Sequence, residues 1–129
     1  MQSTSTQSAR EKLLRDLTDA WNSQNIDRVM ACFEDDASFH AAFGPEPLGQ
    51  TFEGKDAVRN AIAEGFRSFP DGKLVNTSLF VADSHAAAEW SFSYTDANGK
   101  SAAICGTDVY QFAGDKLKSK NVYVKYFVG

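Results

Sequence analysis

Cysteine is scarce in this chain, and its placement argues against a zinc-dependent fold. The 129 residues contain two cysteines, Cys32 and Cys105. Neither has another cysteine or a histidine nearby at the spacing of a zinc site. Both lie in apolar runs, so we expect buried, reduced thiols. The sequence offers no other site for a metal or a cofactor, and we expect neither.

Clustered positive charge and long hydrophobic runs are also missing. The net charge is −4, and no basic stripe is present, which argues against a nucleic-acid partner and against anionic membranes. No run approaches the roughly 20 apolar residues of a membrane span. The first ten residues, MQSTSTQSAR, lack the apolar stretch of a signal peptide. These absences predict a soluble, cytoplasmic protein.

The composition that remains is that of one globular domain. Hydrophobic residues make up 43% of the chain and aromatic residues 12%, which is enough for a core. The length fits a single domain. Residues 1–7 are polar, apart from the first methionine, and have nothing to bury, so we predict a disordered tail there and one domain over 8–129.

Three helices are predicted in the first half of the chain. The first begins at a capping box, residues 8–11, and carries Leu14, Leu17 and Trp21 at helical spacing. A second, short helix is expected to begin at Asp27, and the acidic residues 34–36 are expected to end it. The predicted helices span about 8–25, 27–33 and 54–69, with a short strand at 37–40 and an irregular segment at 44–49.

The apolar period changes from 3.6 to 2 after residue 72, which predicts strands. Trp90, Phe92 and Tyr94 alternate cleanly, and Asn98-Gly99 is a strong hairpin signal. Strands are predicted at about 74–81, 89–94, 104–112 and 117–128. Helices grouped before an antiparallel meander indicate an α+β protein, with the helices on one face of a curved sheet.

Several segments resemble the nuclear transport factor 2-like and SnoaL-like superfamily, which has the ketosteroid isomerase-like cone fold. They are residues 25–27, 33–37, 43–45, 106–112 and 114–117, with Gly54 ahead of the third helix. The resemblance spans about residues 10–128. It implies a cone-shaped barrel of curved, mostly antiparallel sheet, wrapped by three N-terminal helices around an apolar pocket. The superfamily includes isomerases, polyketide cyclases, epoxide hydrolases and non-catalytic binding domains.

The resemblance carries over only one of three isomerase catalytic positions. The protonated aspartic acid of that oxyanion hole corresponds to Asp108. The tyrosine of the hole corresponds to Leu17, and the carboxylate base corresponds to Ala41, beside His40. Limonene-epoxide hydrolases have an arginine where this chain has Gly106. The resemblance therefore implies a pocket more strongly than any one reaction.

Asp108 is the first candidate catalytic residue, because strand parity places it on an apolar face with Tyr110 and Phe112. Lys116 and Lys118 lie in or after a turn and should face solvent, so no cation is evident beside it. Burial without a cation would favour a neutral acid that donates to a ligand oxygen. The alternative is a structural acid, hydrogen-bonded to a tyrosine or to water.

His40 is the second candidate, as a general base near neutral pH. Strand alternation points it away from the face of Ala41, which favours a surface or interface histidine instead. The predicted pocket places Asp108 at depth. Its predicted lining is Leu17, Trp21, Phe39, Phe66, Trp90, Phe92, Tyr110 and Val124.

Two classes of function remain open. One is a cofactor-independent isomerase, cyclase or lyase, such as a hydratase, that acts on a small, apolar, carbonyl-containing molecule through Asp108. The other is a non-catalytic ligand-binding or dimerisation domain. In both cases we predict a homodimer through the sheet face that the helices leave open, where Tyr123, Tyr126, Phe127 and Val128 are expected.

Overall fold

Three helices and six strands make up residues 4–125, the part of the chain that this computed structural model describes. In chain order they are α1 (Thr4–Asn22), α2 (Ile26–Met30), β1 (Phe33–His40), β2 (Thr51–Glu53), α3 (Lys55–Ser68), β3 (Lys73–Val81), β4 (His85–Thr95), β5 (Ser101–Ala113) and β6 (Lys116–Lys125). The predicted α+β class is confirmed.

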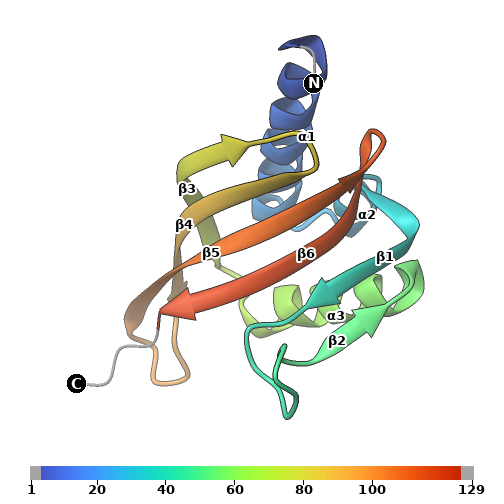
Figure 1. The fold of residues 1–129 in the computed structure, drawn as a ribbon. Helices are drawn as coiled ribbons and strands as arrows, with labels where there is room; N and C mark the ends of the chain where they lie inside the picture. Colours follow the sequence, from blue (N-terminus) through green and yellow to red (C-terminus); the bar gives the residue numbers. More distant parts are fainter. Residues whose placement is uncertain (1–3, 126–129) are drawn as a thin grey trace.

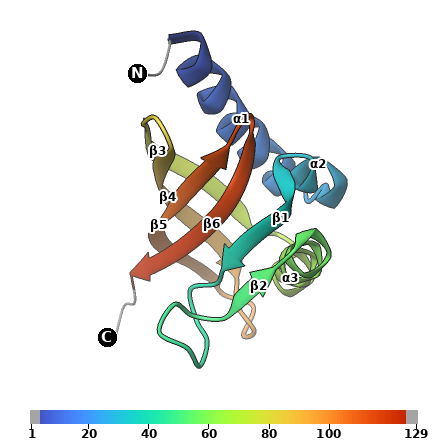
Figure 2. The same cartoon turned by 45° about the vertical axis from the view of Figure 1, so that its right-hand side comes forward.

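The strands form one curved, unclosed sheet in the order β2-β1-β6-β5-β4-β3. Strands β3 to β6 are the predicted antiparallel meander, whereas β1 pairs with β6 in parallel and with β2 antiparallel. Helix α1 packs along β3, and α3 packs along β1 and β2 (Figures 1 and 2). The helices therefore cover one face of the sheet, which we call the inner face.

The core lies between the helices and the inner face. Leu17 of α1 and both Val58 and Ile62 of α3 are buried, as their helical spacing predicts. Phe33 and Leu117 are fully buried where β1 meets β6. Each buried aliphatic or aromatic side chain contributes about 1.5–3 kcal/mol. These contacts fix α1 and α3 against the sheet.

Helix α1 begins at Thr4, four residues before the predicted cap, so residues 4–7 form its first turn. Residues 1–3 lie outside the described part of the chain. The Gln7 side-chain amide donates to the Val81 carbonyl oxygen at 3.1 Å. The Arg10 guanidinium donates to the Asp83 carbonyl oxygen and lies 4.7 Å from the Phe112 ring centroid. These tertiary contacts stabilise a first turn that local composition does not favour.

Strand β1 begins at Phe33, four residues earlier than predicted, and helix α2 ends at Met30 rather than at Phe33. Asn25, not Asp27, caps α2, because its side chain accepts from the Arg28 N–H at 3.2 Å. The acidic residues 34–36 do not end a helix; they lie within β1, with 35 and 36 exposed. An irregularity in the β1–β6 pairing, between Phe33 and Ser38, accommodates them.

Three further outcomes concern smaller features. Strand β2 was not predicted, and residues 126–128 of the last predicted strand lie outside the described part.

Cys32 is buried, and burial raises the pKa of its thiol, but Cys105 is exposed, so the prediction for Cys105 is wrong. Cys105 pairs with Lys125 on the outer face of the sheet. Within 4–125, no helix has the length and apolarity needed to cross a membrane.

Candidate functional site

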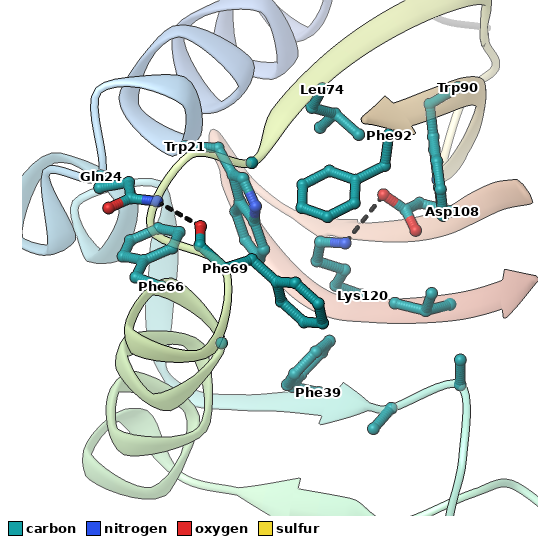
Figure 3. A pocket seen from close by; sticks show the side chains of 15 residues that line it. Trp21, Gln24, Phe39, Phe66, Phe69, Leu74, Trp90, Phe92, Asp108 and Lys120 are labelled. Atoms are coloured by element: carbon teal, nitrogen blue, oxygen red, sulfur yellow. Dashed lines mark hydrogen bonds and ion pairs between the residues drawn. The ribbon is translucent and has the colours of Figure 1, made fainter. Parts of the chain in front are cut away.

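A cavity of about 210 Å³ lies between the helices and the inner face of the sheet (Figure 3). Its walls are mostly apolar. The six aromatic side chains of residues 4–125 that line it come from α1, α3, the segment after α3, β1 and β4. The lining residues are Trp21, Gln24, Phe39, Ala41, Ala42, Gly65, Phe66, Phe69, Gly72, Leu74, Trp90, Phe92, Asp108, Lys120 and Val122.

Aromatic rings in edge-to-face contact shape the walls. The Trp21 and Phe66 ring centroids lie 5.3 Å apart, and those of Phe69 and Phe92 lie 5.6 Å apart. Such pairs add to the burial of the rings and hold them in defined orientations. The two tryptophans of the chain, Trp21 and Trp90, both line this cavity, so their fluorescence reports on its contents.

Asp108 lies in the cavity wall on β5 and is 2% exposed. Its Oδ2 accepts from Lys120 Nζ at 2.8 Å and from the Tyr110 hydroxyl at 3.1 Å. Tyr110 stands opposite Lys120 in the β5–β6 pairing, and Asp108 stands opposite Val122, so the three side chains share the inner face. Oδ1 has no hydrogen-bond partner among the described residues.

Lys120 is the cation of the site, and its side chain is 6% exposed. Its Nζ lies 4.9 Å from the Trp21 ring centroid and 5.7 Å from those of Phe39 and Tyr110. A carboxylate and three aromatic rings therefore replace the water that the buried ammonium has lost. The result is an ion pair held in an apolar wall.

This ion pair corrects the prediction that Asp108 has no cation beside it. Lys116 and Lys118 are exposed, as expected, but Lys120 lies on the inner face. Strict alternation from the buried Leu117 would put Lys120 on the outer face. A register shift between Gln111 and Phe112 turns it inward. The condition for a neutral acid is not met, so we treat Asp108 as a carboxylate paired with an ammonium.

Tyr110 is the third member of the hydrogen-bond network around Asp108 and lies behind the cavity wall. Burial, and then the nearby Asp108 carboxylate, raise the pKa of Tyr110 well above its ordinary value. Its hydroxyl therefore stays protonated and donates to Asp108. It is 5% exposed and is not among the lining residues, so its role is to hold the carboxylate.

The structure does not bring His40 to the cavity. Phe39 lines the cavity, and alternation along β1 turns its neighbour His40 the other way. The His40 ring instead has Nδ1 2.9 Å from the Thr51 hydroxyl oxygen on β2. An acid–histidine pair with Asp108 is therefore not formed.

Five of the eight predicted lining residues surround the cavity together with Asp108. They are Trp21, Phe39, Phe66, Trp90 and Phe92. Leu17 and Tyr110 are buried in the core instead, and Val124 lines a groove with outer-face residues such as Tyr123. Ala41, at the position that the resemblance assigns to a base, does line the cavity, but it carries no acid.

The protein family to which the sequence belongs agrees with this architecture. Residues 14–120 match the SnoaL-like domain, and the chain belongs to that family. Its fold is that of the nuclear transport factor 2-like superfamily. No protein with a curated description is detectably similar in sequence.

Solved structures with the same fold are distant in sequence. A proposed polyketide cyclase from Xanthomonas campestris pv. campestris superposes with a TM-score of 0.81 at 17% identity, over 93% of each chain. A protein named TerC, crystallised with polyporic acid, has a TM-score of 0.77 at 11% identity, over 91% of this chain and 92% of its own. A nuclear transport factor 2-like protein of unknown function from Burkholderia pseudomallei has a TM-score of 0.77 at 17% identity, over 91% of each chain.

Proposed function

We propose that the cavity binds a small apolar molecule that carries a carbonyl group, with the carbonyl oxygen at the Lys120 ammonium. The observation that carries this proposal is the Asp108–Lys120 ion pair, 2.8 Å long, in a wall that is otherwise apolar. Apolar cavities with one or two polar groups are the usual sites for small molecules. The apolar walls would hold the body of the ligand, and the ion pair would orient it.

Lys120 suits a carbonyl oxygen because an ammonium has three N–H donors and Asp108 takes one of them. A donor with full charge makes a shorter and stronger hydrogen bond than a neutral donor. The surrounding rings offer no acceptor oxygen that would compete for the remaining N–H groups, apart from the Tyr110 hydroxyl.

The same pair supports a proton-transfer reaction next to a carbonyl. The Asp108 carboxylate would accept a proton from the carbon beside the carbonyl, and the C–H electron pair would move to the oxygen as an enolate. The Lys120 ammonium would stabilise that oxyanion. In an unsaturated ketone, where the enolate is conjugated with a carbon–carbon double bond, return of the proton from Asp108 to the far carbon completes an isomerisation. Attack of the enolate carbon on a second carbonyl of the molecule, with transfer of the Asp108 proton to the alkoxide that forms, completes a cyclisation. Neither reaction needs a cofactor. The similarity to a proposed polyketide cyclase and to a protein crystallised with polyporic acid supports this class.

A second candidate is ligand binding without turnover. The positions that correspond to the isomerase tyrosine and base are Leu17 and Ala41, and His40 lies away from the cavity. One oxygen of Asp108 already accepts hydrogen bonds from two donors, Lys120 and Tyr110, so only the other oxygen is left for a substrate proton. These observations favour a binding domain. We further propose that this domain works in the cytoplasm as a homodimer.

Binding is tested with 1-tetralone, a bicyclic ketone, and tetralin, the matched hydrocarbon, by titration of tryptophan fluorescence. We expect the ketone to bind more tightly by about 10-fold, the value of one charge-assisted hydrogen bond. The double variant Lys120→Met with Asp108→Asn leaves no unpaired charge and should bind both probes equally. Equal binding of the two probes to the unmodified protein would refute the proposal.

Turnover is tested on the same ketone in deuterium oxide. If Asp108 acts as a base, the hydrogens beside the carbonyl exchange for deuterium faster with the protein than with the Asp108→Asn variant, as proton NMR would show. Binding without accelerated exchange would select the second candidate.

A further inference from the structure

Two buried polar atoms near the cavity have no hydrogen-bond partner within residues 4–125, the described part of the chain. They are Asp108 Oδ1, an acceptor, and Trp90 Nε1, whose N–H is a donor. Asp108 is 2% exposed and Trp90 is 6% exposed, and both residues line the cavity. Buried polar groups are nearly always paired, so two orphans in one wall call for a physical explanation.

The two side chains are neighbours on the inner face. Trp90 on β4 stands opposite Gly106 on β5, and Asp108 follows two residues later on β5. A Cβ at Gly106 would lie 2.8 Å from Trp90 Cζ2, so the six-membered ring of the indole rests on β5. Figure 3 shows the Trp90 indole beside the Asp108 carboxylate, on the side away from Phe39.

We infer that this site selects ligands that carry a hydroxyl group in addition to the carbonyl. One hydroxyl satisfies both orphans, because it donates to Asp108 Oδ1 and accepts from the Trp90 N–H. This inference rests on the proposed function and narrows its ligand class to hydroxylated ketones. Trp90 then acts as a specificity-determining residue, and Asp108 engages the ligand through the oxygen that Lys120 and Tyr110 leave free.

Both orphan atoms are buried, so binding includes a rotation of the Trp90 side chain toward the ligand. A site with buried polar groups that hydrogen-bond a ligand hydroxyl discriminates against the analogue that lacks this hydroxyl, because those groups then stay unpaired. We expect a preference of about 10-fold or more for the hydroxylated ligand.

The test compares 1-tetralone with the hydroxy-1-tetralones, the set of positional isomers that carry one added hydroxyl on the aromatic ring. At least one isomer should bind about 10-fold more tightly than the parent ketone. Trp90→Phe keeps an aromatic ring but removes the N–H, and should reduce that ratio. Phe92→Leu changes an apolar wall residue and removes no polar atom, so it should weaken both probes and leave the ratio intact.

A second readout needs no variant. The chain has two tryptophans, so two indole N–H signals appear in a nitrogen–proton correlation spectrum. The Trp90 signal should move downfield with the best hydroxylated isomer and not with 1-tetralone. If 1-tetralone binds but no isomer gains affinity, or the Trp90 signal responds equally to both, the inference is overturned and the proposed function stands. If neither class of ketone binds in preference to tetralin, the proposed function itself fails.

Discussion

At the scale of single residues, the Asp108–Lys120 pair makes a direct prediction about stability. Lys120→Met removes the cation and leaves a buried carboxylate without its main partner, which should lower the free energy of unfolding by about 3–5 kcal/mol. Adding Asp108→Asn to that variant should recover much of the loss, because no charge is then left unpaired. Urea denaturation of the two variants and the parent measures both effects. A loss below about 1 kcal/mol in the single variant would mean that the pair is solvated.

Tyr110 predicts how stability depends on alkaline pH. Its pKa is raised in the folded protein, first by burial and then by Asp108, so the unfolded chain loses this proton first. The stabilisation is fully present below pH about 10, and it is lost as the pH rises from there toward the folded-state pKa. Tyr110→Phe should therefore lose stability less steeply above pH about 10 than the parent. Parallel slopes in urea denaturation from pH 8 to pH 11 would contradict this.

The sequence predicted the acid of the site but not its partner. Alternation alone puts Asp108 on the inner face, because β4 and β5 pair without interruption. Lys120 could not be placed that way, since the register shift at Gln111 and Phe112 inverts the alternation of β6 after Leu117. Such a shift depends on how two strands pack, and no residue in the turn encodes it. A lysine within an otherwise alternating strand was the only available signal.

At the scale of elements, the lack of a side chain at Gly106 on β5 leaves room for the Trp90 ring of β4 in the cavity wall. A Cβ there would lie 2.2 Å from the Tyr123 carbonyl oxygen and 2.8 Å from the Trp90 ring, so no side chain fits. Gly106→Ala should destabilise the protein by about 1–3 kcal/mol, as overpacking does. This crowding also explains why an arginine at this position, as in the epoxide hydrolases, would need a different wall.

Gly65 in α3 is the matched control. A Cβ at Gly65 would meet nothing within 4 Å, and the residue is helical. Gly65→Ala should therefore stabilise the protein by about 0.5–1 kcal/mol. Thermal unfolding of both variants tests the pair, and a destabilised Gly65→Ala together with an unchanged Gly106→Ala would contradict the packing described.

Whether an element is stabilised by local or by distant contacts decides whether the sequence could predict it. Helix α3 follows from Val58, Ile62 and Phe66, which repeat at helical spacing. The first turn of α1 depends on Gln7 and Arg10, which donate to the distant residues Val81 and Asp83, so the polar composition of the segment did not reveal it. Strand β2 has three residues and exists because it pairs with β1. Elements stabilised by their own periodicity were predicted, and elements stabilised by a partner were not.

At the scale of the whole molecule, the outer face of the sheet carries exposed apolar side chains. Val75, Phe80 and Tyr123 are 58%, 62% and 52% exposed, and the strand pairing puts all three on this face. We propose that a second copy of the chain covers it as a two-fold dimer. Light scattering should give twice the 14.1 kDa of one chain, and Tyr123→Asp should shift the mass toward one chain. A mass of one chain at micromolar concentration would contradict the proposal.

The curved sheet and the helices on its inner face together enclose the candidate site. Helix α1 supplies Trp21 and helix α3 supplies Phe66 to the cavity, and the Asp108–Lys120 ion pair lies in its wall (Figure 3). The sequence predicted this scaffold, because helix and strand periods and the resemblance agree. It could not predict the ligand, because chemistry on this fold depends on a few inward side chains rather than on the scaffold.

The most direct test of the central claim is the infrared carbonyl stretch of 1-tetralone, labelled with carbon-13 at the carbonyl and bound to the protein. A hydrogen bond from the buried Lys120 ammonium should move the band to lower frequency than in cyclohexane. The shift should disappear in the Lys120→Met, Asp108→Asn double variant. A bound carbonyl whose band matches that in cyclohexane, or whose shift survives in the double variant, would contradict the assignment of Lys120 as the group that holds the ligand.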